Sequence, residues 1–170
     1  MVMQVPDLIN NNVRSLVNVL PEGKKLLGID LGTKTIGLAV SDPSLKIASP
    51  IKTLNRSKLK KNSTEIAFIA SEHGIGGIIV GMPINMDGTA SARAQATKDW
   101  AFALVELLFV PIAFWDERLS TAAVEKAMIK ADLSRKRRAK RIDSAAATYI
   151  LQGALDFIQM DTKKKSLDEQ

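Results

Sequence analysis

The stretch from Leu26 to Asp42 constrains the fold of this chain more than any other. Two apolar runs, at residues 26–31 and 36–40, flank Gly-Thr-Lys-Thr, and this pattern predicts two strands joined by a tight turn. Asp30 therefore falls within the first strand and not in a loop. A carboxylate among apolar residues is costly to desolvate, so Asp30 needs a partner, and a metal cation is one candidate. The plain alternative is a surface hairpin in which nearby amides bind Asp30.

Each of the two predicted strands has two different faces. In the first strand, side-chain alternation separates Leu27, Ile29 and Leu31 from Leu26, Gly28 and Asp30. In the second strand a bulky face opposes a small one, which consists of Gly37, Ala39 and Ser41. Small residues let a helix or a ligand approach the sheet closely. The hairpin is therefore expected to form part of a functional site.

Composition narrows the chemistry that this chain can perform. Its 170 residues, 46% of them hydrophobic, fit one domain with a sizeable core. The absence of cysteine excludes disulfides and thiolate metal sites. The single histidine, His73, lies at a predicted helix end, where a structural role is expected. Catalysis must therefore rest on carboxylates, hydroxyls, lysines or a hard metal ion.

The formal charge of +6 has a clear location in the sequence. Six of the 24 basic residues fall in a window without Asp or Glu: Arg135, Lys136, Arg137, Arg138, Lys140 and Arg141. The remaining 18 basic residues balance the 18 acidic ones. A local basic patch suits the phosphates of a nucleic acid, and a solvated charged loop is the alternative.

Neither a membrane span nor a secretory signal is expected. No segment approaches the ~20 consecutive apolar residues that a spanning helix needs. Polar residues at 10–12 and Arg14 interrupt the apolar residues near the N-terminus. We therefore expect a cytoplasmic protein with no membrane partner.

The spacing of apolar residues predicts the remaining elements. Helices are expected at 7–20, 57–73, 89–108, 120–131 and 142–158, and further strands at 47–54, 76–83 and 110–115. Residues 1–23 are expected to be an extension with a short helix outside the main core, so that deleting residues 1–22 leaves a folded protein. Residues 24–160 would form one domain, and residues 161–170 a loose polar tail.

The order of these elements predicts an α/β fold. The first three strands are close enough in sequence to form an antiparallel meander. The last two strands each follow a helix, so they should run parallel to the first. A mixed five-stranded sheet with helices on both faces is the expected architecture.

Three acidic residues lie where the chain otherwise becomes apolar: Asp30, Glu117 after the last strand, and Asp143 in the first turn of the last predicted helix. If the first and last parallel strands are adjacent, Asp30 and Glu117 converge, and small residues at 145–147 let Asp143 approach them. Three converging carboxylates need a cation to stay ionised. Oxygen ligands favour Mg²⁺ or Mn²⁺, and two such ions can activate water and stabilise the leaving oxygen of a phosphodiester.

Four motifs in this order resemble the YqgF family: Gly28 to Lys34, Val80 to Pro83 with Asn85 to Gly88, Trp115 to Thr121, and Ile142 to Ala147 with Ile150 to Gly153. That family comprises pre-16S rRNA nucleases with a ribonuclease H-like fold, also described as similar to Holliday-junction resolvases. The resemblance covers residues 24–158. It implies that Asp30, Glu117 and Asp143 are the catalytic, metal-binding acids. It also implies a role in ribosome biogenesis, with pre-16S rRNA or a ribosomal precursor particle as the partner.

Two further residues join the basic window as expected nucleic-acid contacts. Lys34 lies in the predicted turn, and Arg118 follows Glu117. The family's first motif commonly reads Lys-Arg before Ile-Gly, whereas this chain has Lys34-Thr35. A phosphate contact from the turn is therefore expected to be weaker here.

Three alternatives come from other classes of protein. The first is an endonuclease that cuts branched DNA, which presents the same phosphates as RNA. The second is a silent nucleic-acid-binding module, in which the three acids only pack or cap. The third is an actin-like or sugar-kinase ATPase, because Asp-Leu-Gly-Thr after a strand resembles the first phosphate loop of that class. That class needs two related domains and a second Gly-rich loop, which 170 residues do not supply.

Overall fold

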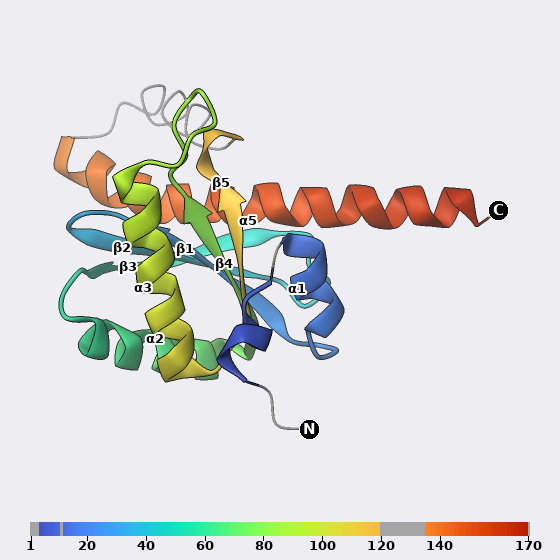
Figure 1. Ribbon diagram of the computed structural model, residues 1–170, viewed down its shortest axis with the longest axis horizontal. Helices are drawn as coiled ribbons and strands as arrows, with labels where there is room; N and C mark the ends of the chain where they lie inside the picture. The colour runs from blue at the N-terminus through green and yellow to red at the C-terminus, as the bar shows by residue number, and fades with distance from the viewer. Residues whose placement is uncertain (1–3, 11, 120–134, 170) are drawn as a thin grey trace.

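The computed structural model describes residues 4–10, 12–119 and 135–169, with side chains except at 119 and 135–144 (Figure 1). Five strands form one sheet in the order β3-β2-β1-β4-β5. Their bounds are β1 Lys25–Leu31, β2 Thr35–Ser41, β3 Ala48–Asn55, β4 Ile75–Met82 and β5 Ile112–Asp116. The first three strands pair antiparallel, and β4 and β5 run parallel to β1. The predicted mixed five-stranded sheet is confirmed.

The helices, with η marking a 3-10 helix, are η1 Val5–Leu8, α1 Val13–Val19, α2 Leu59–His73, α3 Ala92–Leu108, η2 Glu117–Leu119 and α5 Arg135–Asp168. In the part of the chain that the structure describes, no helix is both long and apolar enough to cross a membrane. The helix predicted at 120–131 lies outside the described residues.

The sheet separates two hydrophobic cores, which α2 and α3 cover on one face and α5 and α1 on the other (Figure 1). On the α2–α3 face the sheet contributes Leu27, Ile29 and Leu31 of β1. Leu26, of opposite parity, packs on the α5 face. The alternation predicted for β1 is confirmed, and it places Asp30 on the same face as α5.

Local signals explain the bounds of α2 and α3. Helix α2 ends where predicted, because Gly74 adopts the left-handed conformation with φ of 63° and caps the helix. Helix α3 begins three residues later than predicted. Thr89 instead binds Asp87 in the preceding loop, and the Ser91 side chain caps the helix by accepting from the Ala94 N–H at 3.0 Å.

Helix α5 is longer than predicted at both ends. It begins at Arg135, so Asp143 lies about two turns inside it and not in its first turn. The reason is that the basic run consists of Arg, Lys and Ala, which are strong helix formers, and contains no Gly or Pro. The helix also continues to Asp168, so the prediction of a loose tail from residue 161 is wrong.

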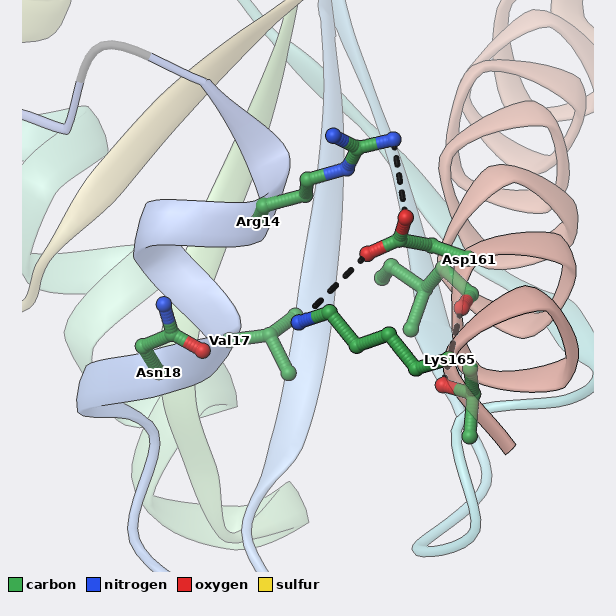
Figure 2. A pocket seen from close by; sticks show the side chains of 7 residues that line it. Arg14, Val17, Asn18, Asp161 and Lys165 are labelled. Atoms are coloured by element: carbon green, nitrogen blue, oxygen red, sulfur yellow. Dashed lines mark hydrogen bonds and ion pairs between the residues drawn. The ribbon is translucent and has the colours of Figure 1, made fainter. Parts of the chain in front are cut away.

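The C-terminal part of α5 is held by α1, and Figure 2 shows the pocket between them. The Arg14 guanidinium lies 2.9 Å from the Asp161 carboxylate, whose other oxygen is 3.9 Å from the Lys165 ammonium. Arg14 also stacks over the Phe157 ring, 4.9 Å from its centroid. These contacts bind α1 to the C-terminal part of α5 and stabilise the helical conformation of the residues beyond 160.

The N-terminal extension forms part of both cores, so the prediction that it lies outside them is wrong. Leu8 is buried in the α2–α3 core, and Val13 and Leu16 are buried in the α5 core. The Asn10 N–H donates to the Ile112 carbonyl at 2.9 Å, which ties the segment to the edge strand β5. The helical spacing in the sequence showed an apolar face but not the surface that it covers.

Replacing Leu16 with Ala should lower the free energy of unfolding by roughly 2–5 kcal/mol, because its side chain is completely buried. Urea unfolding measures this change. The matched control is Val19→Ala on the same helix, since Val19 is 43% exposed and should change stability little. Deleting residues 1–22 should likewise destabilise the protein. Equal, small effects of both alanine substitutions would show that α1 contributes nothing to the core.

Candidate active site

The candidate site lies at the edge of the sheet where β1, β4 and β5 end. Asp30 is the penultimate residue of β1, and Glu117 follows directly after β5 as the first residue of η2. In Figure 1 this edge is the one toward which the β4 and β5 arrows point. Carboxyl ends of parallel strands are the usual place for ligands in α/β sheets.

The structure brings Asp30 and Glu117 together, as the sequence predicts, but by a different route. Their side chains share a hydrogen bond. The predicted adjacency of the first and last parallel strands is wrong, because β4 lies between β1 and β5. Glu117 therefore reaches Asp30 across β4.

Gly81 of β4 leaves the space through which the Glu117 side chain reaches Asp30. A methyl group at Gly81 would lie 2.7 Å from Oε1 of Glu117 and 2.5 Å from Cδ1 of Ile150 in α5. Both distances are shorter than carbon atoms tolerate, so any larger residue would displace the Glu117 carboxyl group. The glycine is required by close approach and not by backbone conformation.

Burial raises the pKa of the Glu117 carboxyl group above its ordinary value. The hydrogen bond with Asp30 and the positive charge of Arg93 oppose this effect, and the charge of Asp116 adds to it. A hydrogen bond between two carboxyl groups requires that one of them carries the proton. A cation placed between the two groups could take the role of that proton.

Asp116, next to Glu117 in sequence, belongs to a different arrangement. It binds the Arg118 guanidinium through both carboxylate oxygens, with the shortest contact at 2.6 Å. These hydrogen bonds lower the pKa of Asp116. Arg118, an expected nucleic-acid contact, thus lies at the same edge of the sheet as Glu117, with its charge partly balanced by Asp116.

Arg93 is a site residue that the sequence analysis missed. It lies in the first turn of α3, and its guanidinium approaches the Leu31 carbonyl at 3.5 Å, directly after Asp30. Its charge also acts on Glu117, where it lowers the carboxyl pKa. The only sequence signal was a lone arginine beside a helix N-cap, which is common on protein surfaces.

The other predicted residues are placed as follows. Lys34 is exposed in the β1–β2 turn, close in sequence to Asp30. Asp143 and the basic residues Arg135, Lys136, Arg137, Arg138, Lys140 and Arg141 lie on the α5 backbone, and their side chains are outside the described part. Asp143 precedes Ala147 by one helical turn, and a methyl group at Gly28 of β1 would lie 3.0 Å from the Ala147 carbonyl. The expected close approach of the small helix residues to the sheet is confirmed at Ala147.

Comparisons with known proteins agree with this geometry. Residues 24–157 match the model of a family described as "RuvX: Holliday junction resolvase". The chain belongs to the RuvX family, also called YqgF. The predicted family resemblance is confirmed.

Relatives within the family are similar over nearly their whole length. A protein of Cereibacter sphaeroides named "Putative pre-16S rRNA nuclease" is 48% identical over 149 residues, which are 88% of this chain and 93% of that protein. A protein of the same name from Rhodobacter capsulatus is 52% identical over 137 residues, covering 81% of this chain and 86% of that protein.

A solved structure also shares the fold. Thermus thermophilus RuvC, in complex with a Holliday junction substrate, aligns with a TM-score of 0.50 at 15% identity, covering 79% of this chain and 96% of RuvC. This likeness shows the ribonuclease H-like fold that the resemblance to the YqgF family implied.

Gly81→Ala should abolish most activity of the site while the protein stays folded. The three atoms nearest to the new methyl group belong to side chains and not to backbone, namely Cδ1 of Ile150 and Oε1 and Cγ of Glu117, so Ile150 can shift and Glu117 is pushed away from Asp30. The control is Gly77→Ala on the same strand, where a methyl group would meet Leu26 and Leu16 at 2.9 and 3.2 Å but no acid. Nuclease assays and thermal melts of both variants measure the effect. Equal losses of activity in the two variants would show that altered packing, and not displacement of Glu117, causes the defect.

Glu117→Gln should stabilise the metal-free protein in a pH-dependent manner. The raised pKa of Glu117 means that its contribution to stability is full below the ordinary carboxyl pKa and is lost as the pH rises through the raised value. Glutamine imitates the protonated form, so the Tm of the variant should match wild type near about pH 4 and exceed it at neutral pH. Thermal melts in a chelator across this range test the expectation. A variant that melts below wild type at neutral pH would contradict it.

Proposed function

We propose that this protein is a metal-dependent nuclease that hydrolyses phosphodiester bonds and processes the 5′ end of pre-16S rRNA in ribosome biogenesis. The observation that carries the proposal is the contact between the Asp30 and Glu117 carboxyl groups at the carboxyl edge of the sheet. The names of relatives 48–52% identical to the chain support the substrate. The ribosomal precursor particle is the proposed partner, and the cytoplasm the proposed location.

The residues at this edge fit a divalent metal. Asp30 and Glu117 offer only oxygen ligands, which suit Mg²⁺ or Mn²⁺. Within the described side chains, no group of three or more potential ligands forms a metal site. We propose Asp143 as the third ligand, since α5 packs directly on β1 one turn further along at Ala147. The metal would supply activation of water and charge stabilisation of the leaving oxygen.

The chain's own residues have separate roles in this proposal. The burial that raises the pKa of Glu117 keeps the acids in a partly dry environment, where charge interactions are strong. Arg93 lies beside Glu117 and the Leu31 carbonyl, where it can bind a phosphate oxygen of the substrate. Lys34, Arg118 and the basic window 135–141 would bind the phosphates around the scissile bond.

Replacing the three acids tests the proposal. Asp30→Asn, Glu117→Gln and Asp143→Asn should each abolish most cleavage, and the triple variant should lose little more, because groups that act together are not additive. The control is Asp99→Asn, an exposed acid of α3 that hydrogen-bonds only Gln95 among the described residues. The assay is single-turnover cleavage of a pre-16S rRNA 5′ end. Near-normal cleavage by a folded Asp30→Asn protein would contradict the catalytic role of Asp30, and absence of cleavage by wild type would favour the silent binding module.

The metal dependence of the same assay gives a second readout. Cleavage should require Mg²⁺ or Mn²⁺ and fail with Ca²⁺, whose looser coordination positions the reacting groups poorly. Full activity in a chelator would contradict a metal-dependent reaction.

A branched-DNA substrate is the second candidate, since the matching family model is described as a Holliday junction resolvase. A four-way DNA junction belongs in the same assay beside the RNA substrate. Preferential cleavage of the junction would replace the RNA assignment but keep the roles of the acids.

A further inference from the structure

A second group of cations lies at the same edge of the sheet as the acids. Between Asp42 and Glu65 the chain has six basic residues and no acidic one. Four of the six follow each other around the end of β3 and the start of α2: Arg56, Lys58, Lys60 and Lys61. All four are exposed, as is Lys34 in the neighbouring turn. Outside the basic window the chain has 18 basic and 18 acidic residues, but they are unevenly distributed. The segment between Asp42 and Glu65 is therefore a second local excess of positive charge.

Backbone contacts place this group beside Asp30. The last residue of β3, Asn55, pairs with Thr35, which follows the β1–β2 turn. The Arg56 N–H donates to the Lys34 carbonyl at 2.9 Å, and its guanidinium donates to the Gly32 carbonyl at 2.8 Å. The turn that directly follows β1 and the connection from β3 to α2 are thus bound into one unit.

A buried asparagine holds the connection in a defined conformation. The Asn62 side chain is completely buried, and its oxygen accepts from the Ser57 N–H at 2.8 Å. Its nitrogen donates to the Asn55 carbonyl at 3.1 Å. Both ends of the amide are therefore used to fix the segment that carries Arg56 and Lys58, which lowers the entropy lost when a ligand binds there.

The lysines lie where they are unfavourable for folding. Lys58 is the N-cap of α2, and Lys60 and Lys61 are in its first turn, which has no acidic residue. The helix dipole disfavours cations at this end. Within the described side chains, none of the three forms an ion pair with a carboxylate. Their placement is not explained by stability of the helix.

We propose that Lys34, Arg56, Lys58, Lys60 and Lys61 form a contact surface for the phosphate backbone of the nucleic acid, here named the β3–α2 basic surface. It lies on the β3 side of Asp30, whereas Glu117 and Arg118 lie on the β5 side. A nucleic-acid strand whose scissile phosphate lies at the acids would therefore extend over this surface on the β3 side. Lysine ammonium groups bind phosphate as point charges, so the surface binds without reading sequence. This inference rests on the proposed nuclease function and specifies how its substrate lies.

The test compares two pairs of lysines in the full-length protein. Lys60→Gln/Lys61→Gln alters the surface, and Lys163→Gln/Lys164→Gln makes the same charge change on exposed residues near the far end of α5. Binding of a structured RNA hairpin is measured by fluorescence anisotropy in a chelator, between 50 and 200 mM salt. Each lost phosphate contact reduces the salt slope by about 0.9. The first variant should therefore lose affinity, and its deficit relative to wild type should shrink about tenfold across this salt range.

The outcomes separate the surface from net charge and from misfolding. The Lys163/Lys164 variant should bind like wild type, and equal losses in both variants would overturn the proposal. Unchanged binding by the Lys60/Lys61 variant would also overturn it. The Tm of this variant should equal or exceed that of wild type, because two cations leave the positive end of a helix. A lower Tm would contradict the dipole argument, and Lys58→Gln with Lys34→Gln would then repeat the binding test outside the helix turn.

Cleavage by wild type in Mg²⁺ distinguishes this inference from the proposed function. A wild-type protein that binds through Lys60 and Lys61 but cleaves neither RNA nor junction would remove the nuclease and keep the surface. A wild-type protein that cleaves, with unchanged binding by the variant, would keep the nuclease and remove the surface.

Discussion

The close approach of α5 to the sheet is the constraint on which the rest of the structure depends. A methyl group at Gly28 would lie 2.8 Å from Cβ of Leu151, and one at Gly81 would lie 2.5 Å from Cδ1 of Ile150. Neighbouring strands β1 and β4 therefore present glycine where the helix crosses them. The lack of a side chain at Gly81 also lets Glu117 reach Asp30. Dense packing of the helix and pairing of the acids thus have one cause.

The ends of the chain stabilise this arrangement from a distance. Helix α1 buries Leu16 in the core beneath α5, and Arg14 binds Asp161 near the far end of the same helix. The hydrogen bonds of Gln152 to Ala48 and Lys46 add a contact with the β2–β3 connection. One long helix is thereby fixed along its length, and the same helix carries Asp143 and the basic window. Packing far from the acids therefore supports the geometry near them.

The charges at the carboxyl edge of the sheet do not favour the stability of the protein without a ligand. Burial raises the pKa of the Glu117 carboxyl group beside Asp30, and three lysines lie at the positive end of α2. Each arrangement disfavours the folded protein in the absence of a ligand. A divalent cation and a polyanion are the ligands that would relieve both. Violations of local stability rules commonly mark functional sites in this way.

The sequence by itself determined the parts of this protein that depend on near neighbours along the chain. Strand alternation placed Asp30 on one face of β1, the short connections required an antiparallel meander, and Gly74 ended α2. Only the tertiary structure decided that β4 separates the strands of the two acids, that Gly81 opens the path between them, and that Arg93 joins the site. Only the tertiary structure showed that residues of the N-terminal extension are buried in the two hydrophobic cores. The physical reason is that periodicity and capping act over a few residues, whereas a path between side chains depends on distances set by the packing of elements remote in sequence.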